Sequence, residues 1–550
     1  MSINSALTMA VNAMQVNQLA FNVVQNNVSN MNTTGYSKQR VNLATRALGG
    51  TQALNAQTQA YRNAGVQIAS ISRYSNEYLA EYGRNNNSKL AYFSTAAEIS
   101  NHITTLVEEL SDGGLSKAFD DFYTAATNLQ QKPTDKTSRM DYIEKANNVA
   151  ILLNSKYKDL TDYRTTLVGD GTGASMDASQ LADNVNKANS LLDDLVQINK
   201  QIVSSGTLNS AANNLYDQRD AILSELSNYL DITTTIDNNG VATVSLGDRE
   251  LVRHTTLTAK FSMEANNTIE DDQRVTINLV DADGKLLKAN INDQIQGGSI
   301  GAILDMGGKS DTDLTVQTAI DLLNNLAQGF AETLNSIQKQ GWNADGTPDK
   351  NAKDFAMAIS TDADGNMILA APTEDFFVTN DGSNILTAGN ISVNNILRTD
   401  SDKLAVAKVT REAGKDVNAF FTKVTDANGN TVITLDGNPD RFGVGNGKSM
   451  IDVLNTRNST TNSKLSNLAP EDFLMSGISK IGIQADSIEN QGTSQESIVK
   501  SIEDRLMSET SVDLNEELTD MIKYQRSYQA SARVFNACCD ILNTLVSLGA

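Results

Sequence analysis

The stretch INSALTMAVNAMQVNQLAFNVVQNNVSNM, residues 3–31, decides the architecture of this chain. One stripe of it is defined by alternating spacings of four and three, and it consists of Ile3, Leu7, Ala10, Met14, Asn17, Phe21, Val24, Val28 and Met31. This spacing places all of these side chains on one side of a helix, which is typical of a coiled-coil seam. A cluster of turn formers ending in Gly35 predicts the end of the helix.

The C-terminal stretch LNEELTDMIKYQRSYQASARVFNACCDILNTLV, residues 514–546, has the same spacing. Its stripe consists of Leu514, Leu518, Met521, Gln525, Tyr528, Ala532, Phe535, Cys539, Leu542 and Val546. Each seam has one clearly polar member, Asn17 and Gln525, of the kind that fixes register at some cost in stability. Long apolar seams need a partner, so the sequence predicts an assembly surface in which the terminal helices pack with each other or with neighbouring copies.

The composition argues against several functional classes. A length of 550 residues predicts roughly three to four domains, and an apolar content of 40% supports several small cores. The net charge of −22, without any polybasic run, argues against nucleic acid and against an anionic membrane surface as partners. The two histidines, His102 and His254, are far apart and are expected on a helix face and at a strand or its edge. That leaves little for a histidine metal site or a general base.

The N-terminal segment does not look like a cleaved signal. Residues 1–37 contain no charged side chain, and Asn and Gln interrupt the apolar positions repeatedly. We therefore expect neither a signal peptide nor a membrane span. The two cysteines, Cys538 and Cys539, are neighbours on a predicted helix, where a disulfide between them would be strained. They are expected to be small apolar residues at or beside the seam.

The predicted elements follow a nearly palindromic order, with helices on either side of a β-rich middle. Helical periodicity is found in residues 5–31, 75–110, 115–129, 138–167, 178–203, 211–230 and 320–337, near residue 449, and after Pro470. Alternating patterns surround the turn sequences at residues 237–240 and 281–284, which is typical of hairpins. Residues 36–71 are expected to form an extended connector or short strands.

The motifs that resemble sites of chemistry have simpler interpretations. The glycine-rich residues 169–173 lack the ending of a phosphate loop, so they are expected to form a turn. The DADG sequences at 281–284 and 362–365 lack the glutamate that an EF-hand needs at position 12. Hairpin turns are favoured, and weak surface calcium binding at the Asp362 loop is left open. Arg219 is expected to pair with Asp217 or Asp220 in a structural role, worth tenths of a kcal/mol if exposed.

A nucleophilic centre is not indicated either. No nucleophile elbow is predicted, and neither cysteine has a histidine near it in the sequence. We therefore assign no catalytic, cofactor-binding or metal-ligating residue and expect no cofactor. The candidate functional residues are those of the two seams.

Four segments resemble a known family. Residues 26–37, NNVSNMNTTGYS, are similar to the N-terminal signature of flagellar rod, hook and hook-associated proteins, and residues 512–518 and 522–533 resemble their closing motif. Within that class, QKPT at 131–134 and DQRD at 217–220 are similar to the hook-associated protein 1 family, the first hook–filament junction proteins of the bacterial flagellum. The adjacent cysteines and the apparent insertion at about 412–442 depart from the family pattern.

The resemblance implies an α+β fold that is mainly α. Residues 1–35 and 508–550 would form a terminal coiled-coil domain on the inside. A mainly helical middle domain would comprise residues 36–230 and 449–507 with about 313–341. Residues 231–312 and 342–448 would form a β-rich outer portion.

The resemblance also implies a non-catalytic structural adaptor at the distal end of the hook. Its expected partners are the flagellar hook protein, the next hook-associated junction protein, copies of itself in a ring, and a flagellar export chaperone on the C-terminal helix. The implied location is the extracellular hook–filament junction, reached through the flagellar type III apparatus without a cleaved signal. Two alternatives stay open: another extracellular axial or filament protein of the flagellum and, with less support, a hydrolase with helical assembly arms.

Overall fold

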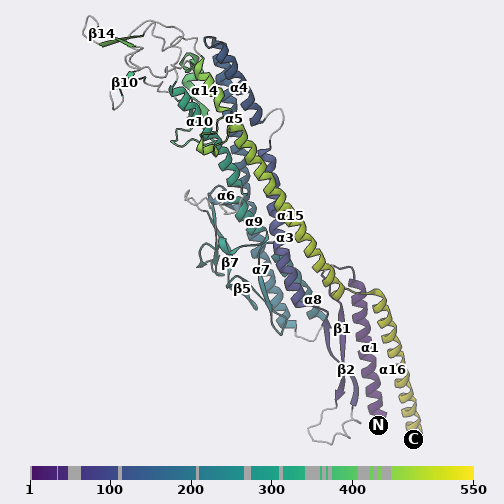
Figure 1. The fold of residues 1–550 in the computed structure, drawn as a ribbon. Helices are drawn as coiled ribbons and strands as arrows, with labels where there is room; N and C mark the ends of the chain where they lie inside the picture. Colours follow the sequence, from purple (N-terminus) through teal and green to yellow (C-terminus); the bar gives the residue numbers. More distant parts are fainter. Residues whose placement is uncertain are drawn as a thin grey trace. The chain divides into compact units, whose positions relative to one another are not determined.

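The computed structural model describes residues 3–33, 35–47, 63–108, 114–205, 210–265, 274–308, 314–340, 359–361, 367–369, 375–406, 421–425, 431–435 and 447–549 (Figure 1). Its contacts divide the chain into two units. Unit 1 consists of Met1–Ala96, Gly171–Leu304 and Glu489–Ala550, and unit 2 of Ala97–Asp170 and Asp305–Ile488. Two long helices, α3 (Glu77–Val107) and α15 (Pro470–Thr510), contribute residues to both units. The three-part division expected from the sequence stays a prediction.

The ends of the chain form a layer of their own within unit 1. Helix α1 (Ile3–Asn30) packs against α16 (Leu514–Gly549), and the antiparallel strands β1 (Gln39–Ala47) and β2 (Asn63–Arg73) pack on α1 (Figure 1). The shared core consists of Ala20, Val23, Val41 and Ile71, with Ile68 and Tyr524 packed against it. Strands are therefore present where the sequence predicted a connector or short strands.

The rest of unit 1 combines helices with two small sheets. Its helices include α6 (Gly173–Asp177), α7 (Gln180–Ser205) and α8 (Ser210–Ser227), and α9 (Gly298–Gly307) begins in it. One sheet has the order β3-β4-β5-β6, with strands Thr233–Ile236, Ala242–Leu246, Arg249–Arg253 and Thr256–Leu257. The other has the order β7-β8-β9, with strands Lys260–Ala265, Val275–Val280 and Leu286–Lys288. The apolar stripe of α7 packs against β5, β6 and β7, because its buried positions recur every three or four residues.

Unit 2 has an aromatic core between helices. It contains α4 (Leu115–Gln131), α5 (Lys136–Val168), α10 (Val316–Gln340), α12 (Asn395–Thr399) and α14 (Lys448–Thr456). Short hairpins pair β10 with β11 (Ile359–Thr361, Met367–Leu369), β12 with β13 (Phe377–Thr379, Ile391–Val393) and β14 with β15 (Phe421–Thr425, Thr431–Leu435). The rings of the core stack edge to face or tilted and belong to Phe119, Phe122, Tyr142, Phe330, Phe376 and Phe377. Single 3-10 turns lie at Asn292–Gln294 (unit 1), and at Ser401–Lys403 and Ser463–Leu465 (unit 2).

The mainly helical α+β class is confirmed, and the predicted helices are found with ends shifted by a few residues. His102 lies exposed on α3, whereas His254 lies in the turn between β5 and β6 with a φ of 54°. The candidate calcium loop at 362–366 and the insertion at 412–442 fall wholly or largely outside the described residues. Among the described helices, none has both the length and the apolar character needed to cross a bilayer.

Candidate assembly site

The helices that carry the predicted seams pair with each other in antiparallel fashion. Near the end of α1, Asn27 bonds to Glu517 near the start of α16, and one heptad further along, Tyr524 packs on the cluster that contains Ala20. Asp513 caps the start of helix α16, because its carboxylate accepts hydrogen bonds from the backbone N–H groups of residues 515 and 516, which have no partner within the helix.

The α1 seam is partly turned towards neighbouring elements. Ala10 and Val24 are buried, Met31 is exposed, and the intermediate members are Ile3, Leu7, Met14, Asn17, Phe21 and Val28. The most buried stripe lies one residue nearer the N-terminus and comprises Val16, Ala20, Val23 and Asn27. This stripe also has 4-3-4 spacing, so it could have been found from the sequence. It includes the small Ala20 and the polar Asn27, which a search for large apolar residues passes over.

The α16 seam is divided between covered and open positions. Met521, Tyr528, Ala532, Phe535 and Leu542 are partly buried, as are Cys538 and Cys539, which form no disulfide. By contrast Gln525 is exposed, and so are Leu514, Leu518 and Val546. Further exposed apolar side chains on this helix are Ile522, Val534, Ile541, Leu545 and Leu548. A concentration of exposed apolar groups on one helix is typical of an interaction surface, and the assembly role of the seam stays a prediction.

A polar cluster ties the helix pair to the rest of unit 1. We call it the motif junction, and it comprises Asn27, Tyr36, Ser37, Lys38, Gln39, Arg73, Asp217, Arg219, Asp220 and Glu517. The amide of Asn27 is at its centre and is fully used. Its nitrogen donates to the Gln39 carbonyl at 2.9 Å and to Glu517 Oε2 at 3.0 Å, and its oxygen accepts from Gln39 N at 3.0 Å and from the Tyr36 hydroxyl at 2.8 Å.

Lys38 joins the segment after α1 to the first turn of α16. Its ammonium group lies 2.6 Å from Glu516 Oε2 and 3.2 Å from Glu517 Oε1, and its backbone N–H donates to the Thr510 carbonyl at 2.9 Å. Burial alone would lower the pKa of Lys38, but the bonds to the two glutamates outweigh it and raise that pKa. Burial, helped by the charges of Asp217 and Glu517, raises the pKa of Tyr36, so its hydroxyl stays protonated and can donate to Asn27.

Two arginines hold the acidic side chains of α8. Arg73 bonds to Asp217 Oδ1 at 2.8 Å and to Asp220 Oδ2 at 2.5 Å, and Arg219 bonds to Asp220 Oδ1 at 2.6 Å. Both guanidinium groups lie over the Tyr216 ring, at 5.5 and 5.4 Å from its centroid. Burial raises the pKa of Asp217, although the bond to Arg73 opposes this shift.

The expected pairing of Arg219 with Asp220 is confirmed, but the pair is not exposed. Arg219 is only 1% exposed, so the small value for an exposed ion pair does not apply. Its other partner, the carbonyl of Gly240, belongs to the hairpin turn between β3 and β4. Arg73 was missed, because nothing in the sequence of β2 indicates that its last residue reaches a helix 144 positions away.

The Gly240 turn offers a test of how firmly the motif junction is packed. Gly240 and Gly284 occupy equivalent turns with φ of 81° and 82°, but a Cβ would overlap the Tyr216 ring only at Gly240. We expect Gly284→Ala to lower the free energy of unfolding by about 1 kcal/mol through backbone strain alone. Gly240→Ala should cost about 1–3 kcal/mol more, because Tyr216 is held between two arginines. Urea unfolding of both variants measures the difference, and equal losses would show that Tyr216 moves freely.

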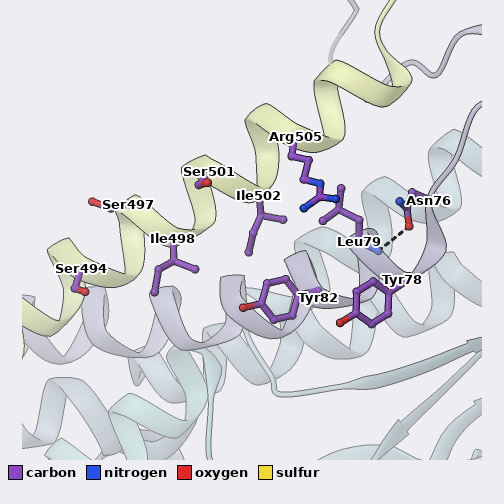
Figure 2. A pocket seen from close by; sticks show the side chains of 10 residues that line it. All are labelled: Asn76, Tyr78, Leu79, Tyr82, Ser494, Ser497, Ile498, Ser501, Ile502 and Arg505. Carbon is purple, nitrogen blue, oxygen red and sulfur yellow. Dashed lines mark hydrogen bonds between the residues drawn. The ribbon is translucent and has the colours of Figure 1, made fainter.

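A second feature of unit 1 is an open groove of about 620 Å³ between the start of α3 and the last part of α15 (Figure 2). Tyr78 and Tyr82 line it from α3, and Ile498, Ile502 and Arg505 line it from α15. Tyr78 is 80% exposed. The groove presents aromatic and aliphatic surface without a paired acid and base, so its chemistry suits packing rather than catalysis. In the described part of the chain, no group of three or more His, Cys, Asp or Glu side chains is placed to hold a metal ion.

Comparison with known proteins starts with the two ends of the chain. Residues 7–36 match the model of flagella basal body rod proteins, and residues 507–548 match that of the C-terminal region of flagellar basal body rod FlgEFG proteins. The ends therefore define the class of flagellar rod and hook components. Residues 100–352 match the helical domain of the flagellar hook-associated protein FlgK.

Relatives that are similar over the whole chain point to one kind of flagellar component, the hook-associated proteins. Flagellar hook-associated protein 1 of Bacillus subtilis (strain 168) is 23% identical, with 98% of this chain and 97% of the relative covered. The proteins of the same name from Salmonella typhimurium and Escherichia coli (strain K12) are 23% and 24% identical, with 99% of this chain and all of each relative covered. The helical-domain match and these whole-chain relatives support the FlgK family of flagellar hook-associated proteins, and the relatives are named as structural components of the flagellum and not as enzymes.

A solved structure supports the fold. The flagellar hook junction protein FlgK from Burkholderia pseudomallei matches with a TM-score of 0.56 at 15% identity, covering 78% of this chain and all of that one. At this identity the likeness concerns the fold alone. The matches to flagellar rod and hook proteins support association with other components of the flagellar hook.

Proposed function

We propose that this chain is an adaptor that assembles at the distal end of the hook and joins the hook to the filament through its terminal helices. The observation that carries the proposal is the state of α16, which pairs with α1 and still exposes a series of large apolar side chains. Leu514, Leu518 and Val546 are 40, 44 and 69% exposed. Apolar surface of this extent is stabilising only when something covers it.

The partners follow from the family and from this surface. The proposed neighbours are the hook protein on one side, the next hook-associated junction protein on the other, and copies of this chain in a ring. Residues 1–35 and 508–550 would form the inner domain, and the β-rich segments 231–312 and 342–448 would face outward. The description of the Burkholderia relative as a hook junction protein supports this role.

Folding and assembly would be coupled in this mechanism. The seam residues of α1 and α16 gain about 25 cal/mol for each Å² of apolar surface that docking removes from water, which offsets the entropy of ordering the helices. A flagellar export chaperone would cover the C-terminal helix before that step. Export would proceed through the flagellar type III apparatus without cleavage of a signal.

Immunogold electron microscopy of intact flagella tests the proposed location. A junction adaptor should label a short zone between hook and filament. Label along the filament would assign the chain to the bulk filament, and label on the rod or along the hook would assign it to another axial component. Either of these patterns would contradict the junction role.

A further inference from the structure

The pairing of α1 with α16 raises a question of register, meaning which residues of the two helices face each other. Asn27 bonds to Glu517, and one heptad further along α16 Tyr524 packs on the cluster that contains Ala20, which lies one heptad from Asn27 on α1. Continuing by heptads places Ala13 opposite Ser531 and Ala6 opposite Cys538, and all four of these side chains are partly buried. Small residues pack almost equally well after a shift of seven positions, so they discriminate poorly between registers.

The predicted polar seam members do not supply the discrimination. The Asn17 side chain donates to the Ala13 carbonyl of its own helix at 2.8 Å, and Gln525 is exposed. A buried polar contact between the helices is that of Asn27 with Glu517, whose exposed fractions are only 1 and 2%. Lys38 supplies the counter-charge at 3.2 Å, so the buried carboxylate is both paired and hydrogen-bonded.

A shift of the register in either direction would break the contact between Asn27 and Glu517. If α16 moved so that Glu517 faced Ala20, its carboxylate would enter the apolar cluster that contains Val23 and Val41. An unpaired charge in such a place costs several kcal/mol. A shift in the other direction would place Asn27 opposite Tyr524 and leave the amide without Glu517.

We infer that Glu517, held by Asn27 and Lys38, is the positioning residue that fixes the register of α16 on α1. Because residues 36–39 are also bonded to α8 through Asp217 and Asn214, the same contact fixes the helix pair relative to the body of unit 1. The inference deepens the proposed function, on which its role in assembly rests. Its test reads the pairing within one chain and can therefore fail independently of any binding to hooks.

Disulfide trapping in the full-length protein reports the register. In a Cys539→Ser background, Ala6→Cys should cross-link to the native Cys538 in the observed register. With both native cysteines replaced by serine, Ala6→Cys and Ser531→Cys report the register in which Glu517 faces Ala20. With Glu517 present, we expect the yield of the first cross-link to exceed that of the second by about tenfold or more, because the shifted register buries an unpaired charge.

Glu517→Leu removes the penalty for the shifted register, so the two cross-link yields should come within about threefold of each other while their sum is retained. Glu517→Gln, which keeps an acceptor for Asn27 but no charge, should give an intermediate ratio. Asp540→Leu is the matched control, because Asp540 is exposed on the same helix, and it should leave the ratio unchanged.

Three results would overturn the inference. The first is that the two cross-links form in equal yield in the protein that has Glu517. The second is that Glu517→Leu leaves the ratio of the two yields unchanged. The third is that the summed yield is lost in both Glu517 variants. The last would mean that Glu517 is needed for pairing itself and not for the choice of register.

Discussion

Phe535→Asp is expected to reduce binding of the full-length protein to hook tips by at least about 100-fold. Phe535 belongs to the covered part of the α16 seam, where it is partly buried. A carboxylate at this position must give up water without gaining a partner, and that costs several kcal/mol against a total stability of about 5–15 kcal/mol. Unit 2 contains no residue of α16, so it should stay folded.

The matched control is Asn536→Asp. Asn536 is the next residue and is exposed, so this variant adds the same charge to the same turn without entering the covered face. The measurement is the amount of protein bound to isolated hooks, together with a thermal unfolding curve for each variant. Normal binding by Phe535→Asp, or an equal loss in both variants, would refute the role of the covered seam.

Arg73→Ala should lower the free energy of unfolding of unit 1 by about 3–5 kcal/mol. Arg73 is the shared partner of Asp217 and Asp220, and its removal leaves two shielded carboxylates with too few positive charges. Arg73→Lys should recover only part of this loss, because a single ammonium group reproduces poorly the bonds that the two guanidinium nitrogens make to separate carboxylates. Urea unfolding at pH 7 measures both values, and Arg505→Ala, which removes a largely exposed arginine, should change stability by less than about 0.5 kcal/mol.

The loss in Arg73→Ala should also depend on pH. Burial raises the pKa of Asp217 above its unfolded value, and removal of Arg73 takes away the bond that opposes this shift. The folded variant then binds more protons than the unfolded chain, so its relative stability falls as the pH rises through and above the unfolded pKa of about 4. The difference from the parent protein should therefore be smaller near pH 4 than at pH 7. A loss below about 1 kcal/mol at both pH values would show that the network contributes little.

Much of the fold could be predicted because its signals are local. The spacing of apolar residues is read within one helix, and the turn sequences at 237–240 and 281–284 specify hairpins with a glycine at positive φ. In both turns the Asp carboxylate accepts hydrogen bonds from the backbone N–H groups two and four positions ahead. Such features need no knowledge of distant parts of the chain.

The motif junction could not be predicted, because it depends on which distant segments meet. The motifs at 26–37, 217–220 and 512–518 were recognised separately, but their convergence around Asn27 follows from the antiparallel pairing of α1 with α16. Glu517 lies with Glu516 in the first turn of α16, and glutamate side chains are usually exposed. Its burial arises because Lys38 and Asn27 approach it from elsewhere in the chain.

The central claim is that the terminal helices join this chain to the hook. It is tested most directly by adding purified protein to hooks isolated from cells that lack their junction. Full-length protein is compared with a version that ends near Ser511, and binding is scored by electron microscopy and by assay of bound protein. We predict binding at distal hook tips by the full-length chain alone. Absence of binding by properly folded full-length protein, or equal binding by the truncated version, would contradict the claim.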